Sequence, residues 1–261
     1  MKKLIIVTFS IILASCGTVR QKSLSQEENQ DLLILATLWY QRSAEMKALY
    51  HQCYLNAEIA LAENLAWSDA NLPAAVVLDI DETVLDNSPY EGWQVTANKP
   101  YNSSDWKRWV DLAAAAALPG ALEFTHYADS LGVEVFYISN RTVAEMGPTI
   151  QNMAVLGFAN ADSTHMLLKE TSSSKVARRH KLEDSHEIIL LIGDNLADFS
   201  DIYEDRGDDL GFAAVEADRE LFGTRYIILP NPMYGTWLNE LMKHTGRGTT
   251  REKLVRMLET F

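Results

Sequence analysis

The chain has 261 residues, of which 47% are hydrophobic and 23% are charged. That balance is typical of a globular protein with room for one α/β domain and an accessory layer. The 36 acidic and 23 basic residues give a formal charge of −13. This charge argues against binding a nucleic-acid polymer, although a single nucleotide in a local basic pocket stays possible. The two cysteines, Cys16 and Cys53, lack the spacing of a metal site.

The N-terminus has the order of a lipoprotein signal. A basic start, MKK, precedes an apolar run over 4–13, which is too short to span a bilayer, and then a lipobox-like LASC that ends at Cys16. We therefore predict a signal peptide over 1–15, a lipidated Cys16 and a polar tether over 16–29. Gly17 resembles an outer-membrane address, so the expected location is the bacterial cell envelope, lipid-anchored to the outer membrane. The alternative is an ordinary signal peptide with a chance cysteine.

Apolar residues recur at helical spacing over 30–71 and predict one long helix or two consecutive ones. Ser43 is a candidate cap between them. This helical lead-in would serve mainly as a packing layer for a sheet. If Cys16 carries lipid, Cys53 has no disulfide partner within the chain and should pack as a small apolar residue.

The segment AAVVLDIDET over 74–83 carries the first chemical signal. The apolar run 74–78 predicts a strand buried on both faces, and Asp79 and Asp81 follow at its end. Side chains two apart in extended backbone point the same way, so both carboxylates should lie beyond the carboxyl end of the strand. They would need a cation such as Mg²⁺, with Asp79 as a nucleophile and Asp81 as an acid and base. Thr83 would hydrogen-bond the turn. The alternative is an acidic turn with an N-cap.

An aromatic, turn-rich insertion over 84–118 follows and is well placed to cover a site. We expect Trp93 and Trp109 to be local core. Trp106 lies in a predicted helix start, SSDWKRWV, where its face can stack on a flat group.

Further strands are predicted over 133–138 and 166–168. The first is followed by Ser139, Asn140 and Arg141, of which Ser139 and Asn140 can hold phosphoryl oxygens, with a helix N-cap as the alternative. After the second come Lys169 and Lys175, either of which could offset crowded negative charge. We expect the remaining basic residues of that helix to form a solvated face; they are Arg178, Arg179 and Lys181.

The last two strands are predicted over 187–192 and 225–229. Gly193 would allow a sharp turn, and Asp194 and Asp198 could face one metal ion. The alternative is an acidic N-cap with first-turn charge. Tyr234 follows the final strand at the same edge, and the acidic loop 201–209 is expected to be solvated. A surface helix is predicted over 251–261.

The motifs resemble those of a known family. DxDxT after an apolar strand is similar to the first motif of the haloacid dehalogenase superfamily. The longer DIDETVLDNSPY resembles the class C acid phosphatases, the lipoprotein e(P4) family, and GDNLADF resembles their fourth motif. The resemblance runs from the lipobox to PNPMYG. It implies an α/β, Rossmann-like haloacid dehalogenase core over 72–261, with a mostly parallel sheet, helices on both faces, and a smaller helical cap from the N-terminal helices and the insertion.

The resemblance also implies roles. Mg²⁺ would be held by Asp79, the backbone carbonyl of Asp81, and Asp194, with Asp198 in support. The residues that would hold phosphate are Ser139, Asn140 and Lys175, the last fitting the third motif better than Lys169. The residues that would contact the rest of the substrate are Trp106, Arg141 and Tyr234.

The implied activity is magnesium-dependent hydrolysis of phosphomonoesters, with 5′-nucleotides as substrates and an aspartyl-phosphate intermediate. An oligomer is compatible with this reading. Two alternatives stay open: a surface binding lipoprotein without turnover, and a phosphotransferase of the same fold.

Overall fold

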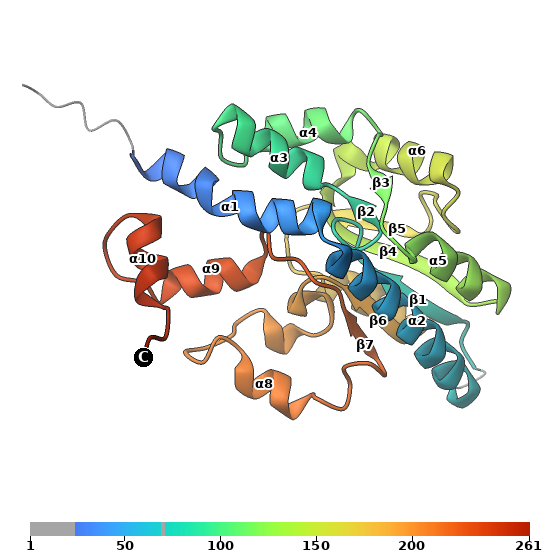
Figure 1. The fold of residues 1–261 in the computed structure, drawn as a ribbon. Helices are drawn as coiled ribbons and strands as arrows, with labels where there is room; N and C mark the ends of the chain where they lie inside the picture. The colour runs from blue at the N-terminus through green and yellow to red at the C-terminus, as the bar shows by residue number, and fades with distance from the viewer. Residues whose placement is uncertain (1–23, 69–70) are drawn as a thin grey trace, which may run out of the picture.

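The central feature of the computed structural model, which describes residues 24–68 and 71–261, is a five-stranded parallel sheet (Figure 1). The strand order is β5 (Met166–Lys169), β4 (Glu134–Thr142), β1 (Ala74–Leu78), β6 (Glu187–Gly193) and β7 (Tyr226–Ile228). Each neighbouring pair is parallel. All five predicted strands are therefore present, and β1, which carries the first motif, lies in the middle of the sheet.

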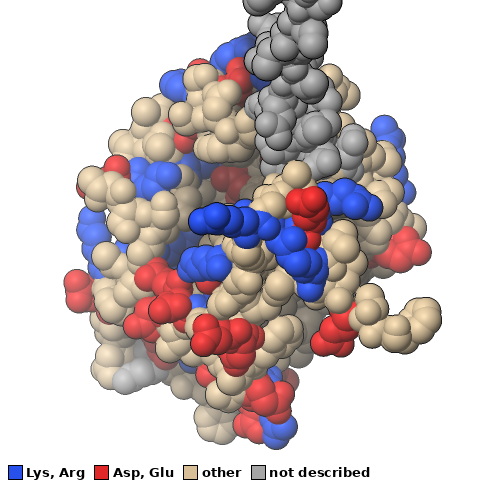
Figure 2. All heavy atoms as spheres, turned by 90° about the vertical axis from the view of Figure 1, so that its left-hand side faces the viewer, with Lys and Arg blue, Asp and Glu red and all other residues tan. Residues whose placement is uncertain are grey.

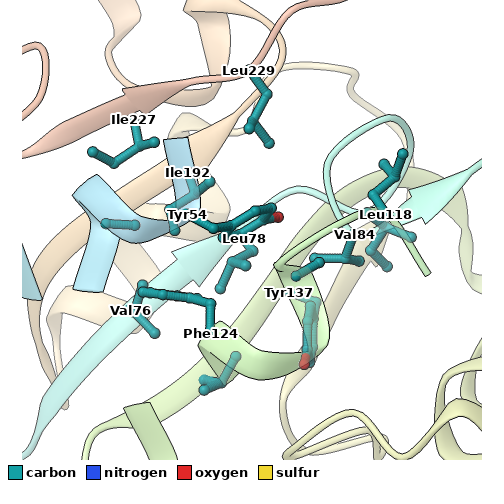
Figure 3. Packing of buried hydrophobic residues seen from close by; sticks show 14 of the residues in the cluster. Tyr54, Val76, Leu78, Val84, Leu118, Phe124, Tyr137, Ile192, Ile227 and Leu229 are labelled. Atoms are coloured by element: carbon teal, nitrogen blue, oxygen red, sulfur yellow. The ribbon is translucent and has the colours of Figure 1, made fainter. Parts of the chain in front are cut away.

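Helices cover both faces of the sheet, as predicted. Alternate side chains of β1 point to opposite faces. Val76 and Leu78 join the larger core cluster, which α2 (Ala44–Trp67), α5 (Ala121–Ser130) and α6 (Met146–Leu156) complete (Figure 3). On the other face, Ala75 and Val77 pack with Leu182 of α7 (Val176–Glu183). Because both faces are buried, β1 is held rigidly from both sides.

The helical lead-in consists of two helices. α1 (Leu24–Arg42) and α2 are separated at Ser43, which is the N-cap of α2 and accepts a hydrogen bond from the Met46 N–H at 3.1 Å. The start of α1 corrects one expectation, since residues 24–29 of the predicted tether are helical; this stretch is rich in Gln and Glu, which favour helix. The predicted signal peptide and Cys16 lie outside the described residues.

The insertion after β1 forms a small helical lobe. It contains α3 (Ser88–Ala97) and α4 (Ser103–Val110), and its base is an antiparallel pair of β2 (Leu85–Asp86) and β3 (Ala116–Ala117). α1 runs alongside α3 in Figure 1. Together these helices build the cap that was expected over the carboxyl edge of the sheet.

The C-terminal third closes the structure from the other side. It contains α8 (Phe212–Ala217), α9 (Thr236–Lys243) and α10 (Thr250–Arg256), and α10 packs against α1 (Figure 1). The last helix thus ends five residues before the predicted 261. Short 3₁₀ turns lie over Val143–Glu145, Leu196–Asp198 and Asp201–Tyr203. Over 24–68 and 71–261, none of the helices combines the length and apolarity needed to cross a bilayer.

The expectation that the acidic loop 201–209 is solvated is wrong for two of its residues. Tyr203 is 1% exposed and donates a hydrogen bond from its hydroxyl to Asp218 at 2.8 Å. Arg206 is 8% exposed and donates to Asn195 at 3.0 Å and Thr236 at 2.5 Å. The charge count of the loop hid these two inward-pointing side chains.

Candidate active site

The candidate site is a cavity of about 880 Å³ at the carboxyl edge of the sheet. Its floor carries Asp79 just beyond β1, Asn140 and Arg141 at the end of β4, and Asp194 just beyond β6. In a parallel sheet the carboxyl ends of neighbouring strands meet at one edge, which is why residues far apart in the sequence come together here.

A buried lysine joins two of the predicted aspartates. Lys175 Nζ lies 2.5 Å from Asp79 Oδ1 and 2.7 Å from Asp198 Oδ1, and its side chain is 7% exposed. Lys175 is the residue just before α7. Lys169 also lines the cavity, but the contact with Asp79 belongs to Lys175. The choice between the two lysines therefore falls on Lys175.

Burial changes the protonation of this cluster. Burial raises the pKa of Asp79 to about 7, against the lowering effect of Lys175. Burial and the neighbouring Asp198 and Asp79 raise the pKa of Asp194 well above its usual value. Although burial lowers the pKa of Lys175, the two carboxylates raise it overall, so the ammonium stays charged. These shifts express an excess of negative charge.

Three carboxylates lie close enough to hold one ion. Single oxygens of Asp79, Asp194 and Asp198 all lie within 4.8 Å of one another. With one ammonium among them, their formal charge is −2, which a divalent cation would neutralise. Oxygen donors of this kind suit Mg²⁺. Asn231 donates a hydrogen bond to Asp194 at 2.8 Å and so fixes the orientation of that carboxylate.

The Asp81 side chain departs from the expected arrangement, because its carboxylate does not belong to this group. Arg141 binds it instead, with Nη2 2.8 Å and Nε 2.9 Å from Asp81 Oδ1, and the Asn87 amide donates to the same oxygen at 2.8 Å. The guanidinium is 2% exposed and turns Asp81 away from the other carboxylates. Asp81 could reach a shared ion only through its backbone carbonyl, as the resemblance implies.

Gly193 has a different reason from the predicted sharp turn. A β-carbon at this position would lie 2.7 Å from both Cβ and Cγ of Asp198. The backbone of β6 therefore has to approach Asp198 closely, and any side chain would push that carboxylate out of the cluster. Asp198 also accepts a hydrogen bond from the Asn195 N–H at 3.0 Å, which holds it from the other side.

The predicted phosphate-binding residues at the end of β4 separate into two kinds. Asn140 lines the cavity. Ser139 is fully buried: its hydroxyl lies 3.5 Å from Asp81 Oδ2 and accepts a hydrogen bond from the Arg141 N–H at 3.2 Å. The Ser139 side chain therefore lies behind Asp81 and is not part of the cavity lining.

Two arginines expected on a solvated helix face belong to the support of the site. Arg178 donates to the Ser139 carbonyl at 2.5 Å and to the Asn140 side-chain oxygen at 2.7 Å. Arg179 is 6% exposed and donates to the carbonyls of Ala197 and Asp198 at 3.0 and 3.1 Å. Sequence spacing gave no signal for these contacts, because both partners come from other strand ends.

Comparison with known proteins decides the family. A family model described as HAD superfamily, subfamily IIIB (acid phosphatase) matches residues 13–237. This chain belongs to that family.

Solved structures agree in fold and in extent. The class C acid phosphatase from Bacillus anthracis superimposes with a TM-score of 0.83 at 38% identity, covering 90% of this chain and 99% of that one. A second structure of a Bacillus anthracis class C acid phosphatase, with tungstate bound, gives 0.82 at 36% identity over the same shares.

Curated relatives are more distant. The stem 31 kDa glycoprotein of Glycine max is 28% identical over 164 residues, and acid phosphatase 1 of Solanum lycopersicum is 24% identical over 164 residues. The matched region covers 60% of this chain and only 58% and 57% of those two proteins.

In this acid phosphatase family member, aromatic side chains form the wall between the site and the cap. Trp106 and Tyr234 both line the cavity, and the Trp106 ring lies 5.7 Å from the Arg141 guanidinium. Trp109 packs against the core and donates to Asn87 at 2.8 Å. Trp93 is half-buried and stacks on Tyr90 with ring centres 5.8 Å apart. Both are thus local packing residues, as expected.

Glu82, for which the sequence suggested no role, is a buried carboxyl beside the site. It has a positive φ of 55° and is fully buried, and burial raises its pKa well above the usual value. Its carboxylate accepts hydrogen bonds from the Asn87 N–H at 2.8 Å and from the Tyr234 hydroxyl. The expectation for its neighbour Thr83 is wrong, because that hydroxyl is buried without a hydrogen-bond partner in the described part of the chain.

Proposed function

We propose that this protein hydrolyses phosphomonoesters through an aspartyl-phosphate on Asp79, with Mg²⁺ as its metal. The observation that carries the proposal is the buried group of Asp79, Asp194 and Asp198 around Lys175, at the floor of an open cavity. A binding protein without turnover has no need for a lysine and three carboxylates that raise one another's pKa in a buried place.

The residues fit a hard divalent cation. Asp79, Asp194 and Asp198 would hold it, and the backbone carbonyl of Asp81 is a further candidate ligand. When bound, such an ion polarises a phosphoryl oxygen and screens the carboxylates from the anionic substrate. Lys175 and Asn140 are positioned to support the remaining phosphoryl oxygens. Tungstate is an oxyanion of phosphate-like shape, and the Bacillus anthracis structure that contains it supports a site for such an anion here.

In the first step, a carboxylate oxygen of Asp79 forms a bond to phosphorus. The ester P–O bond breaks and its electron pair leaves with the alcohol oxygen. Asp81, in its protonated form, gives its proton to that oxygen. Arg141 and Asn87 fix the Asp81 carboxyl in one orientation, so that it can serve the leaving group while Asp79 serves phosphorus.

In the second step, Asp81 takes a proton from water as the water oxygen bonds to phosphorus. The bond between phosphorus and Asp79 breaks, which releases phosphate and restores the carboxylate. The same residue thus acts first as acid and then as base. If an alcohol replaced water, the protein would be a phosphotransferase, and product analysis with added acceptor alcohol distinguishes the two.

We further propose 5′-nucleotides as substrates. Trp106 and Tyr234 line the cavity and offer aromatic faces for a flat base. The hydrogen bond from Tyr234 to the buried Glu82 holds that ring in a defined position.

Phosphate release from a 5′-mononucleotide, with Mg²⁺ and with EDTA, tests the proposal. We expect release with Mg²⁺, its loss in EDTA and its recovery when Mg²⁺ is restored. Mg²⁺ should also raise the melting temperature of the wild type and leave that of Asp194→Asn unchanged, because only a bound ion stabilises the folded state. Full turnover in EDTA would contradict the metal, and no release under any condition would contradict the hydrolase.

The proposed setting is the bacterial cell envelope, with a lipid on Cys16 as the membrane anchor. A Cys16→Ser variant expressed in a bacterium should move from the membrane fraction to the soluble fraction. If the variant stayed in the membrane fraction, the anchor would lie elsewhere.

A further inference from the structure

The cavity continues well beyond the catalytic residues. Its volume of about 880 Å³ is in the range of sites that enclose a whole organic ligand and far exceeds what a phosphoryl group occupies. Asp79, Asp194, Asp198 and Lys175 take up one end. The lining residues at the other end come from α1, α9 and α10, which lie together on one side of Figure 1.

Each of these three helices turns one face into the cavity. The inward positions on each helix are three or four residues apart, the spacing of one helix face. They are Leu33 and Ala36 of α1, Leu238 and Met242 of α9, and Thr250 and Leu254 of α10. Five of these six side chains are apolar, so this end of the cavity, here called the apolar groove, is lined mainly by hydrocarbon.

The charges of these helices stay outside the groove. The segment 243–256 carries Lys243, Arg247, Arg251, Lys253 and Arg256, and none of them lines the cavity. Figure 2, which faces the side of α10, shows Lys and Arg side chains gathered on the outer surface there. A site for a polar leaving group would have turned some of this charge inward.

We propose that the apolar groove is a leaving-group subsite for amphiphilic phosphomonoesters, whose hydrocarbon part lies between α1, α9 and α10 while the phosphoryl group reaches Asp79. This proposal rests on the hydrolase proposed above. The groove and the catalytic floor belong to one cavity, with Trp106 and Tyr234 also in its lining, so an ester bound at Asp79 can extend into the groove. A nucleoside monophosphate would leave the groove unfilled.

A series of n-alkyl phosphates tests the subsite. We would measure kcat/KM for ethyl, butyl, hexyl and octyl phosphate below their micelle concentrations. Burying one methylene group changes affinity about two- to fourfold, so kcat/KM should rise by about that factor for each methylene that enters the groove. Once the chain fills the groove, the rise should stop.

Adjacent residues of α10 provide a matched pair of variants. Leu254 lines the groove, whereas Val255 is 48% exposed and does not. Leu254→Asp should lower the ratio of the octyl to the ethyl value at least about tenfold, and Val255→Asp should leave that ratio unchanged. Ala36→Trp narrows the groove without adding charge and should shift the preference toward shorter chains, which keeps the test decisive if Leu254→Asp folds poorly.

Two kinds of failure are distinguishable. If phosphate is released from every ester but kcat/KM does not change with chain length, the subsite is wrong and the hydrolase stands. The same holds if Leu254→Asp and Val255→Asp lower the octyl-to-ethyl ratio equally. If no ester releases phosphate, the hydrolase is wrong and the leaving-group subsite goes with it.

Discussion

Charged side chains gather at both edges of the central sheet, but their surroundings differ. At the carboxyl edge, the side chains of Asp79, Asp198 and Lys175 are 10%, 8% and 7% exposed. At the amino edge, Glu134 at the start of β4 is 42% exposed and lies 3.3 Å from His165 Nε2 and 3.4 Å from His186 Nε2. Asp162, which is 54% exposed, lies 2.9 Å from His165 Nδ1.

The difference shows what makes a cluster of charges a site. At the amino edge, each carboxylate faces an imidazole and water, so its charge is already compensated and screened. At the carboxyl edge, burial leaves an excess of carboxylates around one lysine and raises the pKa of Asp79 to about 7. Uncompensated charge that is held in place beside a cavity indicates a ligand, whereas compensated charge in water indicates a surface.

The largest expected effect comes from replacing the nucleophile. Asp79→Asn should lower phosphate release at least about 10³-fold, because an amide cannot form the acyl phosphate. The control is the same exchange at the other edge, Asp162→Asn, which should keep full activity. Circular dichroism would verify that both variants fold. An unchanged rate in Asp79→Asn would remove this residue from its proposed role.

A smaller loss, about 10²- to 10³-fold, is expected for Asp81→Asn, because proton transfer to the leaving oxygen is lost. The loss should depend on the substrate. An ester with a strongly acidic leaving group, such as p-nitrophenyl phosphate, needs little protonation and should suffer less than an alkyl phosphate. Equal losses on both substrates would show that Asp81 acts in some other way than as the proton donor.

A third effect concerns stability rather than turnover. Glu91 lines the same cavity, and burial raises its pKa to about 7, so its carboxyl is neutral when folded in mild acid. The stability that this contributes is fully present below pH 4.5, the unfolded value, and is lost as pH rises through 7. Glu91→Gln should therefore become more stable relative to wild type over this interval, by up to about 3 kcal/mol.

Urea unfolding at several pH values between 4 and 8 measures this change. Glu134→Gln, at the half-exposed amino edge, is the control and should show a much smaller dependence. If the two variants changed in parallel with pH, burial in the cavity wall would not be the cause.

The smallest effect is expected at the amino edge itself. His186→Gln removes one of the two imidazoles beside Glu134, whose carboxylate stays in contact with His165 and water. Such a pair contributes at most about 1 kcal/mol, and phosphate release should not change. Thermal unfolding and the phosphate assay together check this. A loss of turnover in this variant would break the contrast between the two edges.

The sequence by itself determined the strands and the residues that follow them. Buried parallel strands read as short apolar runs, and the residues next in the chain must lie at the carboxyl edge. For this reason Asp79, Asp194, Asp198 and Lys175 could be predicted to meet, although they are separated by as many as 119 positions of the chain. The fold class followed from the same pattern.

Only the tertiary structure decided how the side chains pair around that edge. Arg141 turns the Asp81 carboxylate away from the other aspartates, and Arg178 and Arg179 reach back to carbonyls of other strand ends. Glu82 meets Tyr234 across the cavity wall. These contacts depend on side-chain direction and on distance between segments remote in sequence, and local periodicity carries neither. The apolar groove follows the same rule, since it exists only where three helices from opposite ends of the chain come together.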